Sequence, residues 1–143
     1  MRILIGLIVV LAALMLYVRL APTDSALWHK RPIATAPTDT LTAGSFLAAR
    51  QITAPPAQVL EAVEKIALET PRTRLLAGSV AEGMMTFQTR SRLWGFPDQT
   101  TVAIDGDLLL ICGRLRFGQA DLGVNKARVE NWLTALGPLT EPL

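Results

Sequence analysis

The stretch RLRFGQADLGVNKARV, residues 114–129, decides how the last third of the chain folds, because it joins an apolar strand segment to an amphipathic helical segment. Its two glycines allow the backbone to change direction, and Asp121 or a neighbour can cap the helix that follows. Asn125 lies on the helix face that the apolar spacing predicts to be buried. A buried asparagine must be hydrogen-bonded. The stretch therefore predicts a corner that turns a sheet into its last helix.

Upstream of this corner, apolar residues recur with a period of two from Arg74 onward, which predicts a meander of four strands. Turn signals separate the strands at Glu82-Gly83, at residues 95–98 and at Asp105-Gly106. If the last of these is a two-residue hairpin loop, Val102 pairs with Leu109 and Thr100 pairs with Ile111. This register keeps the apolar side chains on one face of the sheet.

The same register predicts that four arginines project from the opposite face: Arg90, Arg92, Arg114 and Arg116. One interpretation is a solvated face whose arginines form weak ion pairs with nearby carboxylates. The other is a site for an anion or a lipid headgroup, because guanidinium groups bind phosphate and carboxylate oxygens through paired hydrogen bonds. The residues leave both interpretations open.

Two amphipathic helices complete the predicted domain. The first begins at Pro55-Pro56, ends before Pro71 and buries Val59, Leu60, Val63, Ile66 and Ala67. The second ends at Gly137-Pro138 and buries Val129, Trp132, Leu133 and Leu136. With a first strand at residues 45–53, the order is β-α-β-β-β-β-α. The predicted fold class is α+β, with an antiparallel sheet of about five strands packed on a C-terminal helix.

The N-terminal segment has sixteen consecutive uncharged residues, 3–18, and continues to Ala21 if Arg19 reaches toward the headgroups. About nineteen helical residues at about 1.5 Å each just span a hydrocarbon core of roughly 30 Å. A cleaved signal peptide is the rival interpretation, because Arg2 supplies a positive start. A cut after Ala21 would, however, place Arg19 at the minus-three position. We expect an uncleaved transmembrane helix at residues 1–21 in a bacterial inner membrane, with a periplasmic domain.

Residues 22–44 contain prolines, threonines and alanines without a sustained period, which predicts an extended juxtamembrane linker. Trp28 interrupts it and either lies at the bilayer surface or docks on the domain. His29, the only histidine, is interpreted as structural. A single domain is expected at residues 45–137, followed by a tail at residues 138–143.

Length and composition exclude several classes of protein and of functional site. Of 143 residues, the part after the apolar segment leaves room for one domain of roughly 100 residues. A net charge of +2 and a pI of about 9.1 are too mild for a nucleic-acid footprint. The single Cys112 has apolar neighbours, which indicates a small buried side chain. The sequence contains no metal-ligand cluster, phosphate-binding loop or catalytic triad spacing, so we expect no metal, cofactor or catalytic residue.

Several short motifs are familiar in combination: Arg90-Ser91-Arg92, Gly95-Phe96-Pro97-Asp98, Arg116-Phe117-Gly118, Asp121-Leu122-Gly123-Val124-Asn125 and Arg128-Val129. Through them, the chain after residue 21 resembles the bacterial family known as domain of unknown function 1499. The segment from Asp24 to His29, placed after an anchor, resembles that of its alphaproteobacterial members. Family members tend to carry serines where this chain has Gly113, Leu115 and Ala120. The resemblance implies a structural motif and no activity.

Three functions are open at this point. The first is a membrane-anchored, non-catalytic domain that binds a lipid, hydrophobic or anionic ligand or acts as an accessory protein at the membrane. The second is an accessory subunit of a larger membrane complex. The third is an enzyme acting on an anionic substrate, with the four arginines as a clamp and Asp98 or Asp121 as general base. The expected partners are the membrane, a lipid or hydrophobic ligand and a membrane protein, with no nucleic acid.

Overall fold

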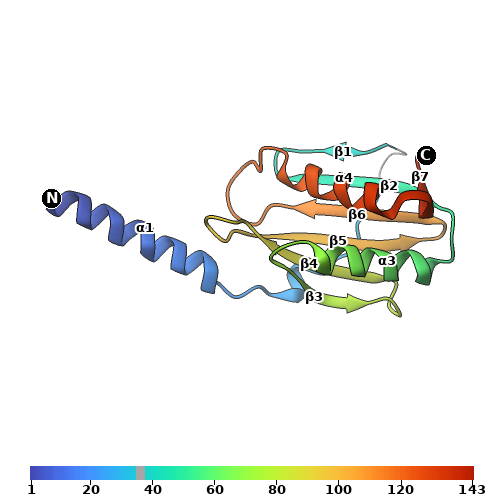
Figure 1. Cartoon of the computed structure of the whole chain (residues 1–143), viewed down its shortest axis with the longest axis horizontal. Helices are drawn as coiled ribbons and strands as arrows, with labels where there is room; N and C mark the ends of the chain where they lie inside the picture. The colour runs from blue at the N-terminus through green and yellow to red at the C-terminus, as the bar shows by residue number, and fades with distance from the viewer. Residues whose placement is uncertain (35–37) are drawn as a thin grey trace.

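The computed structural model describes residues 1–34 and 38–143. An isolated helix, α1, extends away from a domain in which two helices lie over a sheet (Figure 1). The helices are α1 (Arg2–Leu20), α2 (Ser25–Trp28), α3 (Pro56–Glu69) and α4 (Val124–Leu136), followed by the 3-10 turn η1 (Gly137–Leu139). The strands are β1 (Thr40–Leu41), β2 (Ser45–Ile52), β3 (Thr73–Ser79), β4 (Met84–Arg90), β5 (Pro97–Asp105), β6 (Leu108–Arg114) and β7 (Thr140–Glu141).

Among the described residues, seven strands form one sheet in the order β1-β2-β6-β5-β4-β3, with β7 also paired to β2. All neighbouring strands are antiparallel. The fold class is α+β, and the five longer strands follow the predicted order with α3 between β2 and β3. β1 and β7 contain two residues each, too few to show an alternating pattern. The prediction of about five strands therefore missed the two short ones.

The β5–β6 hairpin has its loop one residue later than predicted. Asp105 still belongs to β5 and pairs with Leu108, which leaves Gly106 and Asp107 as the two-residue loop. Gly106 has a φ of 61°, in the left-handed region where glycine meets no Cβ penalty. The aspartate before the glycine therefore extends the strand instead of forming the first loop position.

This shift changes the pairing of the two strands. Val102 pairs with Ile111 and Thr100 pairs with Gly113, so both predicted pairs of this hairpin were wrong. Each partner differs from the predicted one by two positions, which is an even number. Because side chains alternate with a period of two, the apolar residues still lie on the predicted face of the sheet.

β4 and β6 end earlier than the alternation predicts. β4 stops at Arg90, because Gly95, with a φ of 74°, and hydrogen bonds across the loop turn the chain back into β5. β6 stops at Arg114. Arg92 and Arg116 were predicted to project from a strand face, and they lie instead in the loops that follow the two strands.

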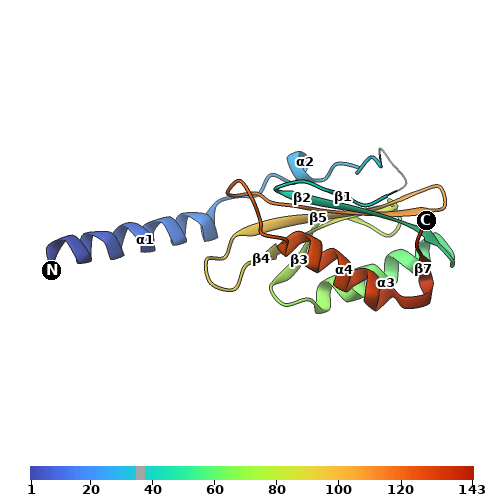
Figure 2. The same ribbon diagram turned by 90° about the horizontal axis from the view of Figure 1, so that it is seen from above.

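α3 and α4 cover one face of the sheet, and α2 lies on the other side (Figure 2). The core on the helix side contains the predicted helical stripes and the inward residues of four strands: Phe46, Ala48, Val59, Leu60, Val63, Ala67, Met85, Phe87, Val102, Leu109, Ile111, Val129, Trp132 and Leu136. Ile66 and Leu133 pack against it while partly exposed. The ring of Trp132 meets that of Phe87 edge-on, with centroids 5.7 Å apart.

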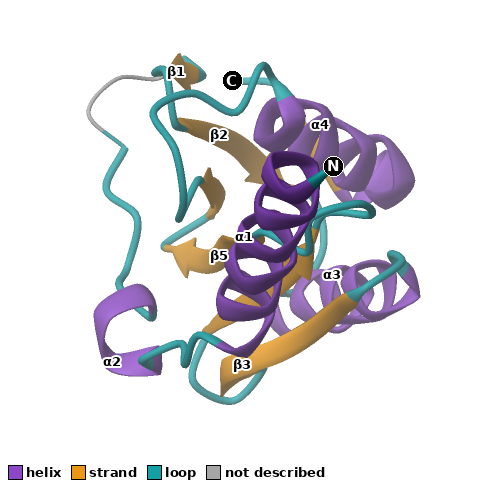
Figure 3. Cartoon of the chain, turned by 90° about the vertical axis from the view of Figure 1, so that its left-hand side faces the viewer, coloured by secondary structure: helices purple, strands orange, loops and turns teal. Residues whose placement is uncertain are grey.

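Residues 22–31, including α2, pass over the opposite face of the sheet (Figure 3). This face is polar, and it buries Thr86, Gln88, Gln99 and Thr101. The expected extended linker is therefore interrupted by α2 and by β1. Residues 35–37 of that linker lie outside the described residues.

α1 is the one helix in the described part of the chain that is long and apolar enough to cross a membrane, a test that an N-terminal signal sequence also passes. Most of α1 is exposed, but Val18 is 4% exposed and Ala21, just after the helix, 8%. Arg90 donates to the Val18 carbonyl (3.3 Å), and Arg19 donates to the Leu93 carbonyl (3.0 Å). The last turn of α1 is thus packed against the domain.

Candidate functional site

Two loops form the end of the domain that adjoins α1. Residues 91–96 connect β4 to β5, and residues 115–123 connect β6 to α4. Both loops lie beside the C-terminal end of α1, whereas the β3–β4 and β5–β6 turns lie at the opposite end (Figures 1 and 2). We call this end the anchor end. The residues of the predicted structural motif meet at or next to it: Gly95, Pro97, Asp98, Gly118, Asp121, Gly123, Asn125 and Arg128.

Asp121 holds the start of α4, as the sequence predicts. Its carboxylate accepts hydrogen bonds from the main-chain N–H groups of Gly123 (3.0 Å) and Asn125 (3.0 Å) and from the side-chain amide of Asn125 (2.7 Å). The first turn of a helix leaves such main-chain donors without an intrahelical partner. Partial burial raises the pKa of Asp121, but these hydrogen bonds outweigh it and bring the pKa below its usual value.

Asn125 is fully buried and joins this corner to a buried ion pair. Its amide also donates to Asp98 Oδ2 (3.3 Å), and its side-chain oxygen accepts from Arg128 (2.8 Å). Arg128 Nη2 lies 3.9 Å from Asp98 Oδ2. Burial raises the pKa of Asp98, and the nearby charge of Arg128 opposes the rise. Gly113 lies beneath the cluster, where a Cβ would approach Asn125 to 2.8 Å.

A pocket of about 320 Å³ opens between the two anchor-end loops. Its lining is mostly apolar and consists of Phe96, Leu115, Phe117, Gly118, Ala120, Leu122 and Val124, with Ser91, Asp98 and Asp121 as polar members. Rings follow one another along the loops, with centroids 6.3 Å apart from Trp94 to Phe96 and 6.3 Å from Phe96 to Phe117. Asp98 Oδ1 is buried and has no hydrogen-bond partner among the described residues. The walls of the pocket are therefore largely apolar.

Arg114 and Arg116, predicted as anion candidates, hold the N-terminal segment. Arg114 donates to the main-chain carbonyl of Trp28 and to the hydroxyl of Thr101 (2.8 Å), and its guanidinium lies 5.2 Å from the centre of the Trp28 ring. Arg116 donates to the Thr23 hydroxyl (2.6 Å) and to the carbonyl of Pro22 (2.6 Å). Both side chains thus fasten residues 22–28 to the sheet.

Arg90 and Arg92 lie at the anchor end. Arg90 donates to the carbonyls of Val18 (3.3 Å) and Gly95 (2.8 Å), so it joins the end of α1 to the β4–β5 loop. A cation is favourable there, because the last carbonyls of a helix carry partial negative charge. Arg92 is exposed and makes no hydrogen bond or ion pair with any residue that the structure describes. An anion or headgroup site at the four arginines stays a prediction.

Trp28 and His29 dock on the domain, which is one of the two arrangements considered for Trp28. His29 Nδ1 lies 2.9 Å from the hydroxyl of Thr86, and Nε2 lies 3.7 Å from the carboxylate of Glu82. Gly78 passes directly beneath, where a Cβ would come within 2.6 Å of the imidazole. These contacts position His29 to hold the segment on the polar face.

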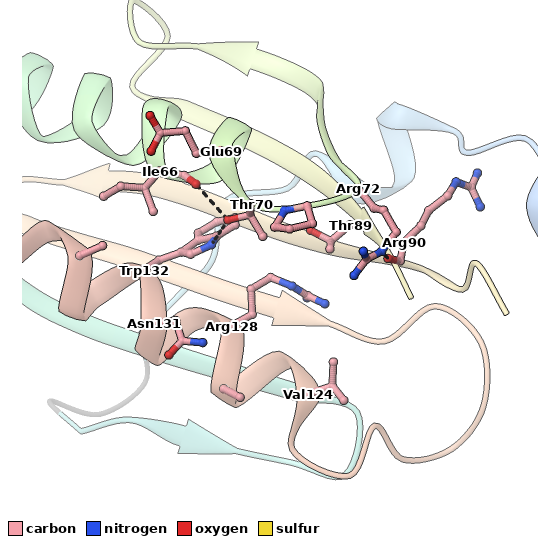
Figure 4. A pocket seen from close by; sticks show the side chains of 13 residues that line it. Ile66, Glu69, Thr70, Arg72, Thr89, Arg90, Val124, Arg128, Asn131 and Trp132 are labelled. Atoms are coloured by element: carbon pink, nitrogen blue, oxygen red, sulfur yellow. Dashed lines mark hydrogen bonds between the residues drawn. The ribbon is translucent and has the colours of Figure 1, made fainter. Parts of the chain in front are cut away.

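A larger depression of about 620 Å³ lies between the end of α3 and α4 (Figure 4). Trp132 lines it and donates to the Thr70 hydroxyl (2.9 Å), which in turn donates to the Ile66 carbonyl (2.9 Å). Arg128 extends from α4 toward β4, and Arg72 donates to the carbonyl of Arg90 (3.0 Å). Within this depression, Trp132, Thr70 and Arg72 therefore already have hydrogen-bond partners.

The titratable groups considered for chemistry at the anchor end are engaged with neighbouring residues. No group of three or more His, Cys, Asp or Glu residues in the described ranges could hold a metal ion. The two carboxylates considered as general bases line one pocket, but Asp121 caps α4 and Asp98 lies against Arg128. Burial raises the pKa of the half-buried Cys112 thiol, although Arg114 opposes the rise.

Sequence reasoning missed the residues that attach the N-terminal segment. Arg19 donates to a loop carbonyl, Thr23 donates to Gln88 (2.8 Å), and Arg31 donates to the Ile104 carbonyl (2.6 Å). Main-chain acceptors in distant strands leave no local signal in a sequence. The loop residue Leu122 did leave a signal in the sequence, because a leucine between Asp121 and Gly123 is an unusual residue for a turn.

The motifs at the anchor end agree with a known family. The family model described as "Protein of unknown function (DUF1499)" matches residues 25–136. The chain belongs to this family. The match covers α2, strands β1 to β6 and helices α3 and α4 of this DUF1499 protein, and it ends before β7. It supports the resemblance that the motifs indicate.

No curated protein matches this DUF1499 chain. Among solved structures, a DUF4468 family protein from Bacteroides ovatus ATCC 8483 is similar, with 14% sequence identity and a TM-score of 0.43. The match covers 85% of this chain and 100% of that chain. A likeness of this size carries no information about function.

Proposed function

We propose that this DUF1499 protein is a membrane-anchored, non-catalytic domain that binds the apolar part of a lipid in the pocket between its anchor-end loops. One observation carries the proposal. The mostly apolar pocket lies at the end of the domain that adjoins the last turn of α1. A molecule leaving the bilayer beside α1 would meet this opening, and apolar clefts of this kind are the usual form of small-molecule sites.

The contacts at the end of α1 support an uncleaved anchor. Signal-peptide cleavage after Ala21 would remove Val18 and Arg19, and with them the hydrogen bond from Arg90 and the one to Leu93. It would also uncover the surface that now buries Val18. Contacts of this kind are expected of a permanent part of the fold. We place the domain in the periplasm, tethered to the inner membrane, as short N-terminal anchors usually leave their tails in the cytoplasm.

The pocket narrows the class of ligand. Its volume of about 320 Å³ is at the lower end of the roughly 300–1,000 Å³ typical of ligand pockets. It therefore suits one apolar chain or ring system better than a whole phospholipid. Exposed Arg92 is available to an anionic headgroup beside the loops.

Native mass spectrometry of the full chain, purified from membranes in mild detergent, tests the proposal. We expect wild type to retain a lipid and the pocket-filling variant Leu115→Trp to lose it. Leu68→Ala, which removes an exposed apolar side chain from α3, is the matched control and should retain it. A wild type without lipid, or equal retention in Leu115→Trp, would overturn the proposal. Consistent co-purification with another membrane protein in place of a lipid would favour the accessory subunit.

A further inference from the structure

Large apolar side chains are exposed at the tips of both anchor-end loops. Leu93 in the β4–β5 loop is 69% exposed, and Leu122 in the β6–α4 loop is 96% exposed. Val124, at the start of α4, is 51% exposed. Trp94 lies next to Leu93 and stacks on Phe96. Tryptophan beside exposed leucine is the composition of a surface that meets a membrane interface.

The backbone of Leu122 strengthens this observation. Its φ is 54°, in the left-handed region that a leucine rarely adopts, and the next residue, Gly123, has a φ of 83°. Glycine would satisfy the same turn without strain. The leucine side chain gains little burial from the fold in return, because almost all of it is exposed. A strained and exposed leucine therefore points to a partner outside the chain.

Arginines cluster at the anchor end, and Asp98 and Asp121 beside them are already engaged by Arg128 and by the start of α4. Burial and the like charges of Arg74, Arg116 and Arg19 lower the pKa of Arg90, because these cations lie near one another. Exposed Arg92 adds to them. Acidic residues occupy the turns at the opposite end of the sheet: Glu82, Asp105 and Asp107. Such a distribution turns the anchor end toward an anionic surface.

The position of α1 indicates that this anionic surface is the membrane that α1 would span. Its 19 residues, at about 1.5 Å each, just span a hydrocarbon core of roughly 30 Å, which places Arg19 at the interface. Arg19 donates to the carbonyl of Leu93 (3.0 Å), so the β4–β5 loop is held at the level where the helix leaves the membrane. The tips of both loops extend toward α1 in two perpendicular views (Figures 1 and 2).

We propose that the two loop tips insert Leu93 and Leu122 into the interface of the membrane that holds α1, with Arg92 and its neighbouring arginines among anionic headgroups. The partner is the lipid surface itself. This docking rests on the proposed anchoring by α1, and it brings the mouth of the pocket against the bilayer. It does not depend on whether the pocket is occupied.

Depth measurements on the full chain in vesicles test the docking. In a Cys112→Ala background, Leu122→Cys carries a nitroxide label, and Glu82→Cys at the opposite end carries the matched control label. Vesicles contain phosphatidylcholine with phosphatidylglycerol. Electron paramagnetic resonance should show the label at position 122 reached by dissolved oxygen more than by an aqueous nickel complex, and the reverse at position 82. Equal aqueous access at both positions in chains that resist carbonate extraction would overturn the docking while leaving the anchor intact.

Two further variants and a change of lipid test the roles of Leu122, of the anionic lipid and of the pocket separately. Leu122→Gly should fold, because glycine suits the backbone at this position, and a label at Leu93→Cys should then lie closer to the water. The same label should also become shallower in vesicles of phosphatidylcholine alone. An unchanged depth in both cases would contradict the roles of the leucine and of the anionic lipid. In Leu115→Trp, the label at position 122 should keep its depth, so a failure of the ligand pocket is distinguished from a failure of docking.

Discussion

The two faces of the sheet are both buried, but by different means. On one face, α3 and α4 cover a continuous apolar core that includes Phe87 and Trp132. On the other, residues 22–31 cover threonines, glutamines and Arg114, mostly through hydrogen bonds that end on main-chain carbonyls. Apolar burial stabilises roughly in proportion to the area covered and does not require a specific partner for each group. The polar face is different, because each buried group must find its own partner.

The two layers that cover the sheet, the helices on one face and residues 22–31 (the N-terminal layer) on the other, therefore have different roles. We expect the helix layer, α3 and α4 with the apolar core beneath them, to supply most of the free energy that keeps the domain folded. The N-terminal layer contributes less, because a hydrogen bond made within a protein replaces one made to water, but it fixes where the domain sits relative to α1. The following changes test this division, from the largest expected effect to the smallest.

Phe87→Ala should produce the largest loss of stability. The side chain is fully buried between the sheet and Trp132, so truncation removes apolar burial and leaves a cavity. We expect a loss of about 3–5 kcal/mol in the free energy of unfolding, measured by denaturant titration of the full chain in detergent micelles. Leu68→Ala, at an exposed position on α3, should change it little. A similar loss in both variants would contradict the assignment of the core.

Arg114→Met should have an intermediate effect and should act on the N-terminal layer. The substitution keeps the length of the side chain but removes the donors to the Trp28 carbonyl and the Thr101 hydroxyl. We expect a loss of about 1.5–3 kcal/mol, as for hydrogen bonds made by charged groups. Protease access to residues 22–31 should increase more than access to the helix layer. Arg92→Met is the control, because exposed Arg92 makes no such contact with the described residues.

Asp121→Ala should have the smallest effect, at the corner that leads into the helix layer. Loss of the bonds to Gly123 and Asn125 should cost about 0.5–2 kcal/mol at neutral pH, as for other helix caps. The folded-state pKa of Asp121 lies below its usual value of 3.8. Its contribution is therefore present above the unfolded pKa and lost as the pH falls through the folded one. Stability curves of wild type and variant should converge in acid, and parallel curves would contradict this role.

The helix layer could be predicted from the sequence because its signals are local. Val59, Val63 and Ala67 repeat with the helical period, and the same holds for Val129, Trp132 and Leu136. The buried, hydrogen-bonded Asn125 also followed from its place in that stripe. The hairpin register did not, because Asp105-Gly106 is compatible with more than one loop position and only the final packing selects between them.

The N-terminal layer could not be predicted, for a physical reason. Its donors, such as Arg114 and Arg116, are visible in the sequence, but a cationic side chain looks the same whether it meets a phosphate or a main-chain carbonyl. The alternation continued past Arg90 and Arg114 and gave no sign that the strands end there. The candidate pocket was equally hidden, because its walls come from two loops that meet only once the sheet has formed.

The short connection between α1 and the sheet limits the distance at which the domain can act. Leu20 ends the helix, and Thr23 is already hydrogen-bonded to Gln88. Three residues span about 10 Å even when fully extended, so a membrane that holds α1 leaves the domain almost no freedom to diffuse away or to search the surrounding solution. Its local concentration at the bilayer is high, and its concentration a few nanometres away is close to zero. Any molecule that it meets must come to the membrane surface.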